Sequence, residues 1–300
     1  MATVRKTAPA RARANGIELC WDSFGDEGAP PLLLIMGLAA QMIAWHDGFC
    51  EQLSEHGFRV IRFDNRDIGL STRFDAAGVP NVGTALTAAL QGQPVTGAPY
   101  LLRDMAADAV GLLDALGIER AHVVGASMGG AIAQTMAIER PERLLTLTSI
   151  MATTGEPGLP PPTPDALGVL LKPPVTTLDG YIESYAQTWK VLRAGSFLED
   201  EALDRERAEQ VFARGLNPPG VARQLVAVLA SGSRKAALAS VRVPTLVLHG
   251  DADPLVPLAC GVDTAESVPG ARLVVIAGMG HALPILFWKR IVEEIAKHAA

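Results

Sequence analysis

The stretch HVVGASMGGAIAQ, residues 122–134, passes directly from two valines to a serine enclosed by glycines and then to an alanine-rich segment. Valine favours β-strands and alanine favours helices, so the stretch predicts a strand, a sharp turn and a helix in immediate succession. Residues 125–129, GASMG, match the pattern G-x-S-x-G, in which the glycines permit a close turn that exposes the serine hydroxyl. Ser127 is therefore a candidate nucleophile; the alternative interpretation is an ordinary Gly-Ser turn without chemistry.

Short, continuously apolar runs recur along the chain, as expected of strands that are buried on both faces of a parallel sheet. They are PLLLIMG (31–37), FRVIRFD (58–64), AHVVG (121–125), LLTLTSI (144–150), PTLVLHG (244–250) and RLVVIAG (272–278). Segments with helical spacing separate several of these runs, and this alternation predicts an α/β fold with a mostly parallel central sheet flanked by helices. The earlier segment GIELCWDSFG (16–25) alternates apolar and polar residues, which favours an antiparallel strand near the edge.

The alternation stops in residues 152–240, where the proline-rich segment TTGEPGLPPPTP (153–164) precedes helical pieces without a strand pattern. We therefore expect a core formed by residues 1–151 and 241–300, with residues 152–240 inserted as a helical cap. The bulky apolar cap residues are expected either to set the preference for acyl chains or to hold the cap helices together. They include Tyr181, Tyr185, Trp189 and Phe197.

A serine hydroxyl needs a base to take its proton, and the base needs a third group to orient it. Both partners are expected on loops that follow other strands of the sheet. The run 244–250 is followed by Asp251 and Asp253, and the run 272–278 is followed by His281. Spacing alone does not choose between the two aspartates, although the proline after Asp253 would restrict its backbone. The order Ser, Asp, His is typical of α/β-hydrolases.

The remaining histidines are expected to have structural roles. His249 ends an apolar run, and we interpret it as a buried, hydrogen-bonded side chain. The others flank predicted helices or strands and do not follow a late strand at a loop: His46, His56, His122 and His298.

Composition and charge indicate which classes of partner the protein is expected to bind. The formal net charge is −6 with scattered basic residues, which does not fit a surface for nucleic acid or anionic membranes. A small-molecule substrate or a protein partner is favoured. The first fifteen residues lack the apolar region of a secretory signal, and no apolar run is long enough to span a membrane. Cys20, Cys50 and Cys260 are widely spaced, which predicts reduced thiols in a cytoplasmic protein and no zinc site.

From residue 17 to residue 297 the chain resembles the α/β-hydrolase superfamily, on the strength of GASMG, the Gly250–Asp253 segment and the GMGH segment 278–281. The segment DNRDIGLS (64–71) also matches a family pattern, a turn that usually shapes the pocket floor and less often contacts substrate. Many relatives carry His-Gly after the first core strand, whereas this chain has Met36 before Gly37. Together these features resemble the serine-esterase subgroup that includes the aclacinomycin methylesterases.

The resemblance implies a catalytic triad in which Ser127 is the nucleophile, His281 the base and then the acid, and Asp253 the orienting carboxylate. It also implies an oxyanion hole formed by the backbone N–H groups of Leu38 and Met128. The expected reaction is hydrolysis of small-molecule carboxylic esters through an acyl-enzyme, with no metal or organic cofactor.

Other functions on the same triad stay open at this stage. The family includes lactonases, perhydrolases, carbon–carbon bond hydrolases and iminopeptidases. An iminopeptidase would hold a free amine with acidic cap residues, for which the chain offers Glu183, Glu199, Asp200 and Glu201, although such charges more often form a solvated helix face. A ligand-binding receptor that retains the triad and turns over slowly is an alternative of a different class.

Overall fold

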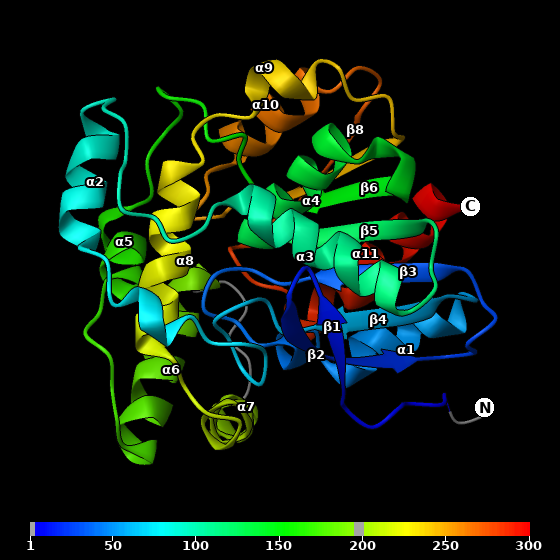
Figure 1. The fold of residues 1–300 in the computed structure, drawn as a ribbon, viewed down its shortest axis with the longest axis horizontal. Helices are drawn as coiled ribbons and strands as arrows, with labels where there is room; N and C mark the ends of the chain where they lie inside the picture. Colours follow the sequence, from blue (N-terminus) through cyan, green and yellow to red (C-terminus); the bar gives the residue numbers. More distant parts are fainter. Residues whose placement is uncertain (1–3, 195–200) are drawn as a thin grey trace.

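The computed structural model describes residues 4–194 and 201–300, and within these ranges the chain forms an eight-stranded sheet with helices on both faces (Figure 1). The strands are β1 (Ala10–Ala14), β2 (Ile17–Phe24), β3 (Pro31–Ile35), β4 (Arg59–Phe63), β5 (Ala121–Ala126), β6 (Leu144–Ile150), β7 (Thr245–Gly250) and β8 (Arg272–Ile276). Their order across the sheet is β1-β2-β4-β3-β5-β6-β7-β8.

Strand direction follows the hydrophobic patterns. The strands β3 to β8 run parallel to one another, whereas β2 pairs antiparallel with both β1 and β4. The hairpin between β1 and β2 turns at Asn15 and Gly16, whose φ angles of 47° and 80° suit a tight two-residue turn. The predicted α/β class, with a mostly parallel sheet and an antiparallel strand near one edge, is confirmed.

Helices on both faces explain why the strands are apolar without interruption. In β3, Leu33 and Ile35 contribute to a core cluster with α3 and α4, whereas Leu32 and Leu34 point to the opposite cluster with α1 and α11. The flanking helices are α1 (Asp47–Glu55), α3 (Leu102–Ala115), α4 (Met128–Glu139), α10 (Leu258–Ser267) and α11 (Ile285–Ala299).

A helical insertion joins β6 to β7, and most of it lies beside the sheet, on the left in Figure 1. Its helices are α5 (Pro164–Leu170), α6 (Leu178–Leu192), α7 (Glu201–Ala213), α8 (Pro218–Ala230) and the short α9 (Lys235–Leu238). The helix α2 (Val82–Leu90) precedes the insertion in sequence but packs against α8, whereas α9 packs against α4 and α10. The insertion is thus connected to both the early and the late part of the sheet domain.

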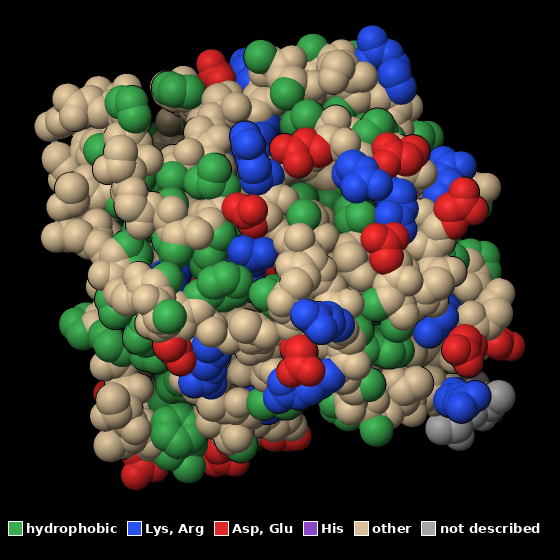
Figure 2. All heavy atoms as spheres, in the orientation of Figure 1, with side chains coloured by type: hydrophobic (Ala, Val, Ile, Leu, Met, Phe, Trp, Pro, Cys, Tyr) green, Lys and Arg blue, Asp and Glu red, His purple; other side chains and the backbone are tan. Residues whose placement is uncertain are grey.

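On the face shown in Figure 2, basic and acidic side chains are interspersed and no large field of one sign forms. Such a surface does not attract polyanions over long distances. None of the helices in the described ranges combines the length and the apolar character that crossing a bilayer would require.

Candidate active site

Ser127 lies on the sharp turn between β5 and α4. Its φ of 56° and ψ of −121° are strained for a residue with a side chain. The turn closes only because of its glycines: a Cβ on Gly125 would overlap the backbone of Gly129, and a Cβ on Gly129 would overlap the backbone of Ile35. The Ser127 N–H donates to the Ile150 carbonyl of β6 at 2.9 Å, which ties the turn to the sheet.

The three residues predicted as a triad come together at the carboxyl ends of the parallel strands. His281 Nε2 lies 2.9 Å from Ser127 Oγ, and His281 Nδ1 lies 2.8 Å from Asp253 Oδ2. The carboxylate partner assigns the proton of a neutral imidazole to Nδ1, which leaves the Nε2 lone pair to accept from the serine hydroxyl. His281 and Asp253 are each 6% exposed, so the hydrogen bond between them is shielded from solvent.

The two candidate aspartates have different surroundings, although they lie in the same turn after β7. The second oxygen of Asp253, Oδ1, accepts the N–H groups of Leu255 and Val256 at 2.9 and 2.8 Å. These bonds hold the carboxylate with Oδ2 toward the imidazole. Asp251 is exposed, and its Oδ1 accepts the Gly278 N–H at 2.6 Å. Asp251 therefore stabilises the neighbouring turn and does not reach His281.

The loop that carries His281 contacts the helical insertion directly. The His281 N–H donates to the Leu192 carbonyl at the end of α6, with an N–O distance of 2.7 Å. Gly280 makes room for this contact, because a Cβ there would overlap the backbone of Leu192 and Arg193. The sequence pattern G-x-G-H identified the histidine but not this contact with a helix almost ninety residues earlier in the chain.

Leu38 and Met128 both belong to backbone segments that lie next to Ser127. Met128 is the first residue of α4, so the positive end of the helix dipole lies next to the serine. Leu38 follows Gly37, where a Cβ would lie only 3.1 Å from Ser127 Cβ. Glycine thus lets the backbone of the loop after β3 approach the serine closely.

His249 is fully buried. Its Nε2 lies 2.7 Å from the Val256 carbonyl and 3.7 Å from Asp253 Oδ2, whereas Nδ1 has no hydrogen-bond partner among the described residues. Desolvation lowers the pKa of His249; the hydrogen bond to Val256 and the charge of Asp253 oppose this effect. A neutral imidazole with its proton on Nε2 fits these contacts.

The other histidines outside the triad also have structural surroundings. His46 caps α1 by accepting the Gly48 N–H on Nδ1 at 3.1 Å, and His56 is the residue at the other end of that helix. His122 Nδ1 pairs with Thr146 Oγ1 at 3.0 Å, and His298 Nε2 contacts the Leu147 and Pro244 carbonyls.

The three cysteines are poor candidates for an alternative nucleophile. Cys20, Cys50 and Cys260 are all buried and free. Burial raises the pKa of each thiol, to about 12 for Cys50, so the reactive thiolate form is disfavoured at neutral pH.

The segment 64–71 supports the loops around Ser127 through buried side chains that all have protein partners. Asp64 Oδ1 accepts the Met42 N–H, Asn65 Nδ2 donates to the Met36 carbonyl, Arg66 pairs with Asp108, and Asp67 pairs with Arg223. The segment therefore has a structural role, and its polar side chains are occupied by the protein.

Three polar residues of the insertion complete this network, and no sequence motif marked them. Arg214 pairs with Asp64, the Arg223 guanidinium makes two bonds to the Asp67 carboxylate at 2.7 and 2.8 Å, and Gln224 donates to the Arg66 carbonyl at 2.9 Å. A lone Arg or Gln in a helical segment has no recognisable pattern, because its role depends on what packs against it.

Aromatic residues of α6 form a stripe at helical spacing. The rings of Tyr181 and Tyr185 lie 6.0 Å apart and those of Tyr185 and Trp189 lie 5.8 Å apart, while Tyr181 also contacts Phe212 of α7 at 5.9 Å. Burial raises the pKa of Tyr185 to about 12, so its phenol stays neutral. Glu183, on the same helix, is exposed. Phe197, Glu199, Asp200 and the side chain of Glu201 lie outside the described residues.

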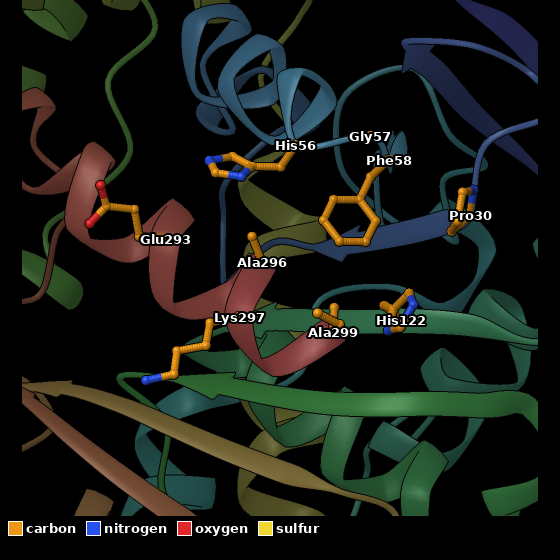
Figure 3. A pocket seen from close by; sticks show the side chains of 10 residues that line it. Pro30, His56, Gly57, Phe58, His122, Glu293, Ala296, Lys297 and Ala299 are labelled. Atoms are coloured by element: carbon orange, nitrogen blue, oxygen red, sulfur yellow. The ribbon is translucent and has the colours of Figure 1, made fainter.

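A groove of about 540 Å³ lies away from the triad (Figure 3). Pro30 and Phe58 directly precede β3 and β4, and His122 lies at the start of β5. The groove is therefore at the amino ends of the parallel strands, whereas Ser127 follows the carboxyl end of β5. The two features lie at opposite ends of the sheet and are separate.

Comparison with known proteins identifies the family of the chain. A profile of the alpha/beta hydrolase fold matches residues 30–287 of the chain. The chain therefore belongs to the α/β-hydrolase family, which confirms the resemblance seen in the sequence.

Two curated relatives are similar over nearly the whole chain. Rhodomycin D methylesterase DauP from Streptomyces sp. is 33% identical over 94% of this chain and 95% of its own length. Rhodomycin D methylesterase DnrP from Streptomyces peucetius is 33% identical over 97% of this chain and 98% of its own. Among solved structures, the meta-cleavage product hydrolase CumD from Pseudomonas fluorescens has a TM-score of 0.76 at 22% identity, with 96% of each chain covered. That likeness shows a shared fold.

Proposed function

We propose that this chain is a serine hydrolase that cleaves carboxylic esters of small molecules, with Ser127, His281 and Asp253 as its triad. The main support for this proposal is a continuous series of hydrogen bonds. It runs from Ser127 Oγ to the His281 imidazole at 2.9 Å and from there to the buried Asp253 carboxylate at 2.8 Å. A serine placed on a strained turn, with its base already oriented, has the arrangement that acyl transfer requires.

The reaction begins when Ser127 Oγ attacks the ester carbonyl carbon while its proton passes to His281 Nε2. Asp253 stabilises the resulting imidazolium through Nδ1. The backbone N–H groups of Leu38 and Met128 stabilise the negative charge that develops on the carbonyl oxygen, an effect worth about 10²–10³ in rate per donor. The alkoxide leaves with the proton from His281, and an acyl-enzyme remains.

Deacylation uses the same groups in reverse. His281 takes a proton from water, the hydroxide attacks the acyl carbon, and the imidazolium returns the proton to Ser127 Oγ as the acid departs. No metal or organic cofactor takes part in this proposed sequence of steps.

Residues 152–240 act as a cap over the triad in this proposal. The support is the contact between His281 and the end of α6, together with the aromatic stripe that leads away from that end. Planar, apolar substrates would pack against these rings. Because DauP and DnrP are methylesterases, we propose methyl esters of bulky aromatic acids as the substrate class.

The test is a panel assay of the purified protein and its Ser127→Ala variant. The panel contains methyl and p-nitrophenyl esters with acyl groups of increasing size, γ- and δ-lactones, a proline p-nitroanilide and a vinylogous diketone for carbon–carbon cleavage. Preferred turnover of aromatic methyl esters that disappears in the variant would support the proposal. Preferred turnover of a lactone, diketone or anilide would reassign the reaction, and a single slow burst without steady turnover would indicate a receptor.

A further inference from the structure

The loop after β3, residues 36–42, carries Leu38, and its backbone is held by side chains at three points. The N–O distances are 2.8 Å from Asn65 Nδ2 to the Met36 carbonyl, 2.7 Å from the Met42 nitrogen to Asp64 Oδ1 and 3.2 Å from the Ala39 nitrogen to Gln224 Oε1. The first two holding residues belong to the loop after β4, whereas Gln224 comes from α8 of the insertion. The insertion thus forms a hydrogen bond to the loop at Ala39, the residue after Leu38.

Ala39, whose N–H bonds to Gln224, has an unfavourable backbone conformation. Ala39 has a φ of +63°, in the left-handed region that L-residues disfavour. The Ala40 nitrogen lies 3.4 Å from the Gly37 carbonyl oxygen, so residues 37–40 form a turn with Ala39 in its third position. A positive φ there is the mark of a type II turn, which normally carries glycine.

The Ala39 N–H belongs to the central peptide of that turn, which joins it to Leu38. Rotation of this peptide converts a type II turn into the commoner type I turn, changes ψ of Leu38 and φ of Ala39, and turns the Ala39 N–H to the opposite side. A hydrogen bond to the Ala39 N–H therefore selects one of the two turns. Gln224 Oε1 supplies that bond.

Gln224 is itself fixed in one orientation. Its side chain is completely buried, and Nε2 donates to the Arg66 carbonyl at 2.9 Å. A flipped amide would place Nε2 against the Ala39 N–H and Oε1 against the Arg66 carbonyl, which loses both bonds. Arg223 and Asn217 fix this helix by bonding to the carboxylate and carbonyl of Asp67.

We propose that Gln224 is a positioning residue for ester hydrolysis: it holds the 37–40 turn in one form and thereby fixes the position of Leu38, whose N–H is the proposed oxyanion donor. This inference rests on the proposed function. It makes the oxyanion hole dependent on one side chain of α8, so that the helical insertion supports transition-state stabilisation as well as enclosing the substrate. Since one oxyanion donor is worth about 10²–10³ in rate, losing its orientation should lower kcat by about 10- to 100-fold.

The test uses Gln224→Met, which preserves side-chain size and removes both hydrogen bonds. The matched control is Asn217→Ala, which removes another bond between the start of α8 and the Asp67 carbonyl and reaches no residue of the 37–40 turn. We expect Gln224→Met to lower kcat by at least tenfold with KM within about twofold, whereas Asn217→Ala keeps kcat within about threefold. Equal losses in the two variants, in step with their Tm values, would overturn the inference.

A second substitution tests the backbone argument. Glycine adopts a positive φ without strain, so adding Ala39→Gly to Gln224→Met should raise kcat several-fold above that of Gln224→Met alone, with Ala39→Gly as the reference. A double variant no faster than Gln224→Met would contradict the proposed role.

If Gln224→Met does not fold, Gln224→Glu tests the same positioning role. Its protonated carboxyl can accept from the Ala39 N–H and donate to the Arg66 carbonyl, so kcat should stay within about threefold. A kcat loss of tenfold or more in that folded variant would overturn the proposal.

The two proposals fail in different ways. If Ser127→Ala retains the turnover of the wild type, the proposed function is wrong. If Ser127→Ala is inactive while Gln224→Met keeps the wild-type kcat, only the positioning role is wrong.

Discussion

Asp253 holds His281 through one carboxylate oxygen and is itself held through the other. Oδ2 lies 2.8 Å from His281 Nδ1, and Oδ1 accepts two backbone N–H groups of the following turn. The imidazole is thereby oriented by the protein fold before any substrate arrives, which is the condition for using a serine hydroxyl as a nucleophile.

Ser127→Ala is expected to lower kcat for esters by at least about 10⁴-fold, since the oxyanion donors alone leave a small residual rate. The fold should be retained, because alanine also has a Cβ and no core cavity forms. Labelling with a fluorophosphonate probe and circular dichroism measure the two properties. The control is Ser240→Ala, which removes an exposed serine hydroxyl after α9. Equal labelling of Ser127→Ala and the control would contradict the assignment of the nucleophile.

Asp253→Asn and Asp251→Asn form a matched pair within one turn. Asp253→Asn should disturb the imidazole tautomer and lower kcat by up to about 10⁴-fold. Asp251→Asn should keep kcat within about threefold, because its amide oxygen still accepts the Gly278 N–H. Steady-state kinetics with one p-nitrophenyl ester compare them. The reverse ranking would move the acid of the triad to Asp251.

Stability should fall between pH 7 and pH 5, with His249 contributing to the slope. Burial lowers the pKa of His249, so the unfolded chain binds a proton more readily than the folded chain. Its contribution is fully present above the unfolded value of about 6.5 and is lost as the pH falls toward the lower folded pKa, by up to about 1.4 kcal/mol per pH unit.

His249→Asn should therefore show a shallower pH dependence of the urea midpoint than the wild type, although it is less stable at pH 7. His56→Asn replaces an exposed histidine and is the control. Burial also lowers the pKa of His122 and His298, so part of the slope should persist in the variant. An unchanged slope in His249→Asn would exclude His249 as a source of the pH dependence.

Arg223→Met should destabilise the protein by about 3–5 kcal/mol, because it leaves the Asp67 carboxylate buried without its cation. The double variant Asp67→Asn with Arg223→Met should be more stable than Arg223→Met alone, since it removes the unpaired charge. Urea unfolding of the wild type, both single variants and the double variant completes the cycle. A double variant that loses the sum of the single effects would show that the pair is not coupled.

Trp189→Leu should weaken the preference for bulky aromatic acyl groups while changing kcat for an acetate ester by less than about threefold. The reason is that the ring continues the aromatic stripe of α6 but does not belong to the triad. The ratio of kcat/KM for the two esters is the measurement. Gln187→Ala, an exposed position on the same helix, is the control. A uniform loss with both esters that follows a lower Tm would instead indicate that the stripe only holds the insertion together.

The sharp turn at Ser127 could be predicted from the sequence because its causes are local. Valine favours the strand, alanine favours the helix, and the glycines at 125 and 129 permit the overlap between them. The apolar strands could also be predicted from the sequence, since burial on both faces leaves an unbroken hydrophobic run. His281 followed from its position after a late strand and from the G-x-G-H pattern.

The choice between Asp251 and Asp253 depended on the direction of each side chain, which spacing along the chain does not determine. The same holds for Gln224, whose contact with Ala39 joins residues 185 positions apart. Local patterns encode strands, turns and helix starts because neighbouring residues cause them. Partners brought together by packing between distant segments have no such pattern, because either residue alone is compatible with many surroundings until the chain has folded.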